Sequence, residues 1–112
     1  VLARMDRLMK ADRLFFDEDL NLNKLAGELS IEPYQLSQIL NEKLNKNFNM
    51  YINEFRIEEA KKLLLEEPDR SIISVSYAVG FNSPTSFYDW FFKMTGLSPS
   101  KFRKKHNAKT SE

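Results

Sequence analysis

The sequence predicts an all-α protein of about seven helices, arranged as two helix-turn-helix units joined by a long linker helix. Only 3 Gly and 4 Pro interrupt the 112 residues, which leaves few natural breaks. Apolar residues recur at the three- and four-residue spacing of amphipathic helices, and no alternating strand pattern lasts more than a few residues. In addition, the chain repeats itself at an offset of about 50 residues.

Three helices are expected before residue 45. Apolar spacing predicts a first helix over about residues 2–16, ended by the acidic run 17–19. Asn21 offers a side-chain oxygen to cap a second helix, which ends in a tight turn at residues 30–31. Pro33 opens a third helix, since its missing N–H costs nothing at the first helical position.

A long helix over residues 48–67 follows and is stopped by Pro68. Ser71 caps a fifth helix, which ends at a turn over residues 80–82. A sixth helix begins like the third, with a capping residue followed by proline: Ser83 and Pro84 correspond to Glu32 and Pro33.

The sixth helix ends at Gly96. We predict that its residues Phe87, Trp90 and Phe91 belong to the core, because they follow the spacing of a buried helix face. A last short helix opens at Pro99, and a polar tail is expected after about His106.

The internal repeat covers both halves of the chain. Residues 22–31 match 72–81 at an offset of 50, and residues 36–51 match 87–102 at an offset of 51. In each copy a small residue faces inward in the first helix and an apolar residue plugs the turn; these pairs are Ala26 with Ser76 and Ile31 with Phe81. This layout is that of a helix-turn-helix, in which two helices cross closely around a short turn.

A helix-turn-helix can place its second helix in the DNA major groove while the first crosses the backbone. Two copies on one connecting helix could read groove segments about one turn apart, roughly 34 Å. The same shape also occurs in proteins that never touch DNA, so the repeat alone leaves a protein-interaction domain open.

Charge is balanced overall but unevenly placed. The chain has 17 Lys and Arg against 16 Asp and Glu, a net charge of +1. Residues 93–111 contain six basic residues and no acidic one, so the C-terminal end is electropositive. Such a run is either a solvated face or a surface for phosphates.

Composition excludes several classes of protein. There is no Cys, and His106 is the single His, so disulfides and zinc sites built from these residues are excluded. No apolar run approaches the roughly 20 residues of a membrane span. No Gly-rich phosphate loop or framed catalytic pair is present, so we expect neither an enzyme nor a bound metal or cofactor.

The most specific pattern lies in the second copy, at Val79, Gly80, Phe81, Asn82, Ser83, Ser86, Phe87, Phe91, Lys93, Gly96, Ser98, Pro99, Phe102 and Arg103. Residues of the first half match the same pattern, at Leu25, Ala26, Pro33, Tyr34, Leu36, Ser37, Phe48, Tyr51, Ile52, Asn53, Arg56, Ile57, Ala60 and Lys61. With these residues the chain resembles, over about residues 20–105, the DNA-binding domain of AraC/XylS-type bacterial transcription regulators. Residues 36–41 and 48–53 are similar to a subset found at the cytoplasmic end of membrane-bound sensors.

The resemblance implies sequence-specific DNA binding by recognition helices over residues 33–43 and 84–95, in adjacent major-groove segments. Carried over by position, the base-facing candidates of the first unit are Tyr34, Ser37 and Gln38. Those of the second are Pro84, Thr85, Tyr88 and Asp89.

Two departures from the family bear on specificity. Gln38 and Asp89 stand where members often carry Arg. Gln pairs with adenine, whereas Asp accepts only from cytosine and is repelled by phosphates. Asp89 therefore either reads a base or makes a structural ion pair or cap. Phe92 replaces a frequent basic residue, which favours the alternative of a helical protein-interaction domain.

Phosphate contacts are expected mainly from the basic end, at Lys93, Lys101, Arg103 and Lys104. Ser83 is expected to cap its helix, where free N–H groups also suit a phosphate.

The chain begins at Val1 rather than Met, so we expect a piece of a longer protein. We divide it into an N-terminal helix (1–20), a first unit (21–47), a linker helix (48–67), a second unit with a C-terminal helix (71–106) and a tail (107–112). The expected partners are double-stranded DNA and an effector-sensing region of the same longer chain. We expect this segment in the cytoplasm, without membrane contact of its own, and the sequence leaves open a membrane anchor elsewhere in the full-length protein. The sequence leaves open whether the domain forms a homodimer and whether it activates or represses.

Overall fold

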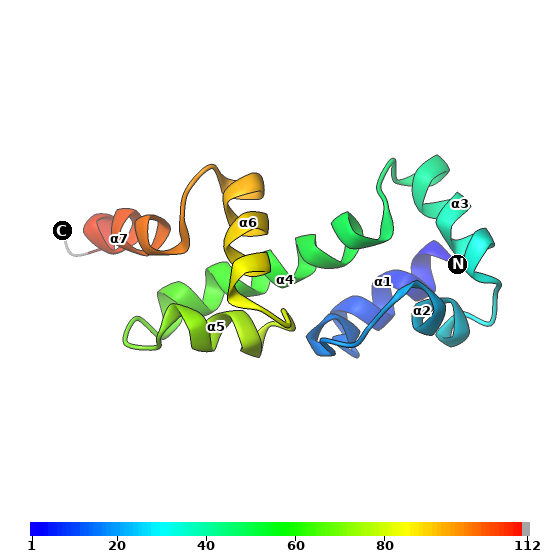
Figure 1. Cartoon of the computed structure of the whole chain (residues 1–112), viewed down its shortest axis with the longest axis horizontal. Coiled ribbons are helices and arrows are strands. Elements are labelled where there is room, and N and C mark those ends of the chain that lie inside the picture. Colours follow the sequence, from blue (N-terminus) through cyan, green and yellow to red (C-terminus); the bar gives the residue numbers. More distant parts are fainter. Residues whose placement is uncertain (111–112) are drawn as a thin grey trace. The chain divides into compact units, whose positions relative to one another are not determined.

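Helices account for all of the regular secondary structure in the residues that the structure describes, which confirms the predicted all-α class (Figure 1). The computed structural model describes residues 1–110, and side chains up to residue 106. The elements are α1 (Leu2–Lys10), the short 3-10 helix η1 (Leu14–Phe16), α2 (Leu22–Glu28), α3 (Pro33–Lys43), α4 (Phe48–Glu66), α5 (Ile72–Ala78), α6 (Pro84–Thr95) and α7 (Pro99–Thr110).

The chain divides into two units at the middle of α4. The N-terminal unit runs from Val1 to Phe55, and the C-terminal unit begins at Arg56. The long helix is therefore not a separate segment between the units. Its first part belongs to the N-terminal unit and the rest to the C-terminal unit.

The N-terminal unit is built around apolar side chains from α1, α2, α3 and the first turns of α4. Its most buried residues are Met5, Met9, Leu25, Ala26, Leu36, Leu40 and Ile52. Aromatic rings extend this core, with Phe15 stacked on Phe55 at a centroid distance of 5.9 Å. Burial of these side chains, at about 1.5–3 kcal/mol each, is what holds the short helix α2 in place.

The C-terminal unit has an aromatic core. Phe87 lies between Phe81 and Phe91, with centroid distances of 5.4 and 5.6 Å, and Phe91 contacts Phe102 of α7 at 5.4 Å. Arg56 is also buried, 8% exposed, and its guanidinium lies 5.6 Å from the centroid of the Phe81 ring. Side chains from the second half of α4, the turn after α5, α6 and the start of α7 thus pack into one core.

The ends of the chain differ from the sequence-based boundaries. The first helix stops at Lys10 rather than near residue 16, because Arg13 adopts a left-handed conformation (φ 53°) before η1. The segments before and after this break both pack into the same core. Because residues 10–13 carry no large apolar side chain, the apolar spacing gave no sign that the helix ends between them. At the other end α7 continues to Thr110 instead of ending near His106, and residues 111–112 of the expected tail lie outside the described residues.

Candidate nucleic-acid interface

Each unit contains two helices joined by the same turn. The turn is a Schellman motif, in which two N–H groups after the helix return to carbonyls of its last turn. Ser30 and Gly80 take the left-handed position, with φ of 57° and 108°. The four bonds are Ser30 N–H to Gly27 O (3.1 Å), Ile31 N–H to Ala26 O (3.0 Å), Gly80 N–H to Tyr77 O (3.2 Å) and Phe81 N–H to Ser76 O (3.1 Å).

The helix caps repeat with the same offsets. Side chains of Asn21 and Ser71 cap α2 and α5, 50 residues apart, and those of Asn47 and Ser98 cap α4 and α7, 51 residues apart. Each cap accepts one of the N–H groups that a helix start leaves free. The repeat therefore includes these two helix starts in each copy as well as the turn.

The second helices of the two motifs, α3 and α6, are the ones that the sequence predicted as recognition helices, and this name is kept for them. Both begin with a proline after a capping residue. At α3 the Glu32 N–H donates to Gln35 Oε1 (2.9 Å), and at α6 the Ser86 N–H donates to Ser83 Oγ (3.2 Å). Ser83 thus has the capping role that the sequence predicted.

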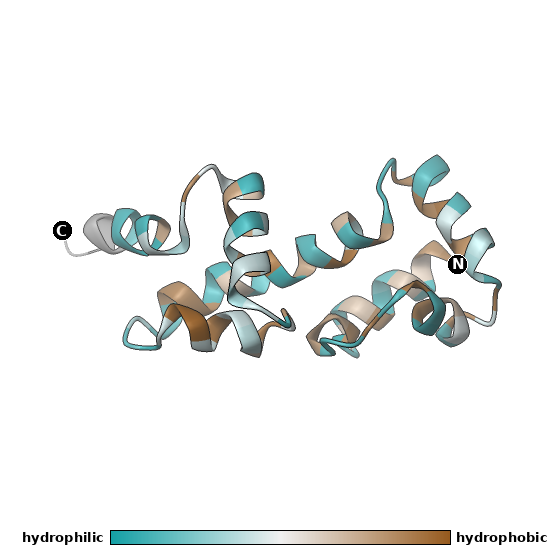
Figure 2. Ribbon diagram, viewed as in Figure 1, coloured by the Kyte–Doolittle hydropathy of each residue, from teal (hydrophilic) through white to brown (hydrophobic). Residues whose placement is uncertain are grey.

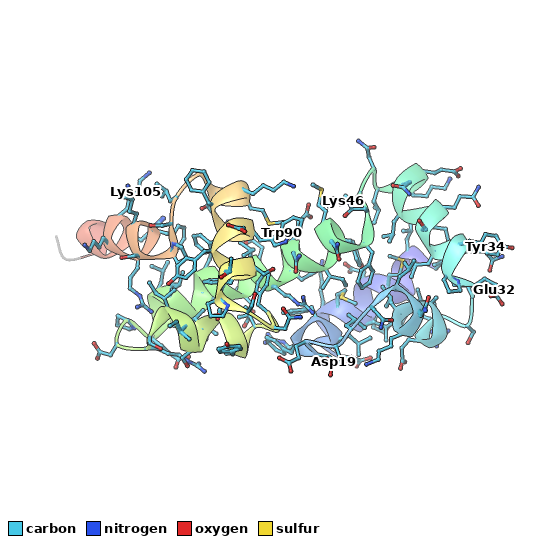
Figure 3. The ribbon with its side chains drawn as sticks, viewed as in Figure 1. Asp19, Glu32, Tyr34, Lys46, Trp90 and Lys105 are labelled. Carbon is cyan, nitrogen blue, oxygen red and sulfur yellow. The ribbon has the colours of Figure 1, made fainter. Side chains whose placement is uncertain are left out.

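The recognition helix α3 buries one face and exposes another. Leu36 and Leu40 are fully buried, as predicted. Tyr34 is 68% exposed and its side chain points away from the helices of the unit (Figure 3). Gln38 is exposed and Ser37 is half-buried. The three predicted base-contact residues of this unit therefore lie outside its core.

Polar side chains on α3 also bond to one another. The Gln38 Nε2 group donates to Glu42 Oε1 at 3.1 Å, and Asn41 Nδ2 donates to the Ser37 carbonyl at 2.9 Å. Glu42 and Asn41 were missed by the sequence analysis. Their positions four residues after Gln38 and Ser37 were the signal that could have found them.

The recognition helix α6 presents a mixed surface. Thr85 and Asp89 are exposed, and Pro84 is half-buried. Tyr88 is exposed and Phe92 is 61% exposed, one turn apart on the same helix. Asp89 makes no hydrogen bond or ion pair with the part of the chain that the structure describes, so its carboxylate is available to a partner.

Trp90 corrects the predicted core. It is only half-buried, whereas Phe87 and Phe91 are fully buried. The Lys93 ammonium lies over its ring, 4.7 Å from the centroid, in a cation–π contact. Apolar spacing placed Trp90 on the core side, but the helix turns this large ring toward the edge of the buried face, where it also contacts a cation.

The basic residues of α7 have two different environments. Lys101, Lys104 and Lys105 are exposed, and Lys105 is labelled in Figure 3. Most of the described part of this helix has the hydrophilic colour in Figure 2. Arg103 is instead half-buried and donates Nε–H to the Leu64 carbonyl (2.9 Å) and Nη2–H to the Glu67 carbonyl (3.2 Å). Arg103 therefore has a structural role at the end of α4 that the sequence did not reveal.

Other kinds of site find no support in the described residues. They contain no group of His, Asp or Glu side chains placed to hold a metal ion. None of their helices is long and apolar enough to cross a membrane. The His106 ring lies against Phe102, with a centroid distance of 4.3 Å.

Two capped helix-turn-helix motifs in one chain, each with exposed polar residues on its second helix, define a double helix-turn-helix domain. The chain belongs to the AraC/XylS-type helix-turn-helix domain family, whose pattern it matches over residues 25–105. The predicted resemblance is thereby confirmed.

Similar proteins are known from several bacteria. An uncharacterised helix-turn-helix transcriptional regulator of Bacillus subtilis, YobQ, is 36% identical over 86 residues, covering 77% of this chain and 35% of that protein. The melibiose operon regulatory protein of Escherichia coli is 29% identical over 89 residues, covering 80% of this chain and 29% of that protein. The chain thus spans about a third of the length of these relatives.

Solved structures share the fold. The C-terminal domain of AraT, a response regulator from Geobacillus stearothermophilus, superposes with a TM-score of 0.83 at 27% identity, covering 93% of this chain and 84% of that one. The DNA-binding domain of the transcription factor AdpA, solved with a target DNA, gives a TM-score of 0.85 at 21% identity, covering 99% and 96%.

Proposed function

We propose that this chain is the sequence-specific DNA-binding domain of a bacterial transcription regulator, with α3 and α6 as its reading helices. The observation that carries the proposal is the duplicated motif: two capped helices around a Schellman turn, with the polar side of the second helix left open to a partner. A helix of this kind fits the major groove, where base edges can be distinguished. Family membership and the relatives named as regulators support it.

We assign contacts with the DNA bases to residues outside the core on each recognition helix. In α3 these residues are Tyr34, Ser37 and Gln38, and in α6 they are Thr85, Tyr88 and Asp89. The free Asp89 carboxylate is an acceptor only, so cytosine N4 is its best partner in the groove. We propose that the two helices occupy adjacent segments of the major groove.

Phosphate contacts are assigned to exposed cations and to one helix start. Lys93, Lys101 and Lys104 are exposed residues. At the start of α6, after Ser83, the Thr85 N–H suits an anion, because Pro84 has no N–H and the Ser86 N–H already donates to Ser83. Arg103 was predicted in this group, but part of its guanidinium already donates to the Leu64 carbonyl of α4 and to the Glu67 carbonyl just after that helix. The binding is expected to weaken with salt, because each neutralised phosphate releases counterions.

The wider setting is also a proposal. The matched part makes up only 35% and 29% of these two relatives, so an effector-sensing region elsewhere in a longer protein would control the domain. Since its ligand is chromosomal DNA, the domain would act in the cytoplasm. For DNA binding we propose a first reading unit at 21–47 and a second, with its C-terminal helix, at 71–106; residues 48–67 connect them, although the two halves of α4 pack in different structural units.

The test is a selection of bound duplexes from a randomised pool, followed by titration of the best duplex at several salt concentrations. We expect one preferred sequence and an affinity that falls linearly on a logarithmic salt scale. Absence of salt-dependent binding to any duplex would overturn the proposal.

A second candidate function is a helical protein-interaction domain. The exposed Phe92 and Tyr88 favour it, because adjacent exposed aromatic side chains often mark protein contacts. Substituting Lys101 should weaken DNA binding if the first proposal is right, whereas an effect of Phe92→Ala on activity with unchanged DNA affinity would favour the second.

A further inference from the structure

The exposed amide of Gln38 is oriented by a neighbour on its own helix. Its Nε2 group donates to Glu42 Oε1 at 3.1 Å, across one turn of α3. An ionised carboxylate can only accept hydrogen bonds, so the amide must turn its N–H side toward Glu42. The carbonyl oxygen of Gln38 therefore faces the other way.

This orientation decides which groups Gln38 has left for a base. One N–H is used by Glu42, which leaves the carbonyl oxygen as an acceptor and one N–H as a donor. Adenine presents a donor, N6–H, beside an acceptor, N7, and so complements this pair. Guanine presents two acceptors, O6 and N7, and would need both N–H groups of the amide.

We propose that Glu42 is a positioning residue for base specificity, which makes Gln38 select adenine over guanine in the groove contacted by α3. The inference rests on the proposed function and deepens it. Glu42 does not itself need to touch the base. The negative charge of Glu42 would repel the DNA phosphates and so lower the affinity for DNA. A role in base selectivity therefore explains this residue better than a role in affinity.

The C-terminal unit has no equivalent arrangement. At the offset of 51, Gln38 and Glu42 correspond to Asp89 and Lys93. A carboxylate has no donor end to be oriented, and the Lys93 ammonium lies over the Trp90 ring instead. Loss of the Glu42 carboxylate should therefore change the preference at one base pair and leave the half of the site read by α6 unchanged.

The experiment first locates the base pair read by Gln38, as the position whose preference disappears in Gln38→Ala. The ratio of dissociation constants for G·C and A·T at that position is then measured for the whole chain and its variants. Glu42→Ala removes the acceptor. Glu42→Asp keeps a carboxylate four residues from Gln38, a spacing at which Gln and Asp also bond, and serves as the rescue variant. Glu66→Ala, at an exposed site at the end of α4, removes the same charge elsewhere.

We expect the wild-type chain to prefer A·T, and Glu42→Ala to lower that preference by about five-fold or more, the lower end of what one bidentate contact discriminates. Glu42→Asp should restore most of it, and Glu66→Ala should leave it unchanged. Replacing the adenine by 7-deazaadenine, which lacks the N7 acceptor, should weaken wild-type binding.

An unchanged ratio in Glu42→Ala, or a wild-type preference for G·C at this position, would overturn the role of Glu42 while DNA binding stands. Absence of salt-dependent binding by the wild-type chain would instead refute the proposed function, and this inference with it.

Discussion

The guanidinium of Arg103 in α7 donates its Nε–H to the carbonyl oxygen of Leu64 in α4, at 2.9 Å. A second bond reaches the Glu67 carbonyl at 3.2 Å. The last carbonyls of a helix have no partner within it and carry its partial negative charge, so a cation is stabilising there. The C-terminal helix is thereby fastened to the end of α4 through a residue that had been expected at a phosphate.

Replacing Arg103 by Ala is expected to lower the free energy of unfolding by about 1–2 kcal/mol, because two charge-assisted bonds to carbonyls are lost. Urea unfolding followed by circular dichroism measures this. Lys104→Ala, one residue away and exposed, is the matched control and should change stability by less than about 0.5 kcal/mol. Equal stability of the two variants would contradict the structural role of Arg103.

The two Schellman turns predict opposite effects of exchanging their central residues. Gly80 has a φ of 108°, which side chains rarely adopt, so Gly80→Ala should destabilise the C-terminal unit by at least about 1 kcal/mol. Ser30 has a φ of 57°, and Ser30→Gly should leave stability equal or raise it by up to about 1 kcal/mol. Thermal melting of both variants checks the pair, and a stabilising Gly80→Ala would refute the assignment of this turn.

Alkaline pH is expected to weaken the N-terminal unit through Tyr51. Burial, with a smaller effect of the Asp6 charge, raises the pKa of Tyr51 from 10.0 to about 12. Because the folded pKa lies above the unfolded one, the stabilisation is complete below pH 10 and is lost as the pH rises through 12. The loss is about 2–3 kcal/mol for a shift of this size.

Tyr51→Phe isolates that effect from the titration of lysines in the same range. The equivalent position of the C-terminal unit is Phe102, so a ring without a hydroxyl suits the site. Unfolding free energies measured between pH 9 and 12 should fall less steeply in the variant. Parallel pH profiles would show that Tyr51 ionises as freely in the folded protein as in the unfolded one.

Measured DNA affinities should distinguish the residues that contact phosphates from those that contact bases. Lys101→Ala is expected to weaken binding to every duplex and to reduce the slope of log affinity against log salt by about 0.9. Gln38→Ala should leave that slope unchanged and alter the preference at one base pair by about 1–3 kcal/mol. Fluorescence titration, with Trp90 as the intrinsic probe, measures the affinities of both variants. If Lys101→Ala weakened binding to some sequences only, Lys101 would contact a base rather than a phosphate.

The sequence alone determined the all-α class, the helices between residues 21 and 96, several of the helix caps and the duplication. Asn21, Ser71, Ser83 and Ser98 cap helices by bonding to N–H groups three residues ahead, so these signals are complete within a few positions of the chain. The buried faces of α3 and α6 followed from periodicity for the same reason, and the exposure of Tyr34 and Gln38 followed with them.

Only the tertiary structure decided what depends on partners far away in the chain. Arg103 bonds to a carbonyl 39 residues earlier, and nothing near it in the sequence distinguishes this from a phosphate contact. Likewise, the half-exposure of Trp90 and the break before η1 depend on which surfaces the neighbouring elements cover. Hydrogen bonds between neighbours in the sequence can be predicted from a few residues. Whether a side chain is packed, hydrogen-bonded or exposed depends on the free energy of the whole fold.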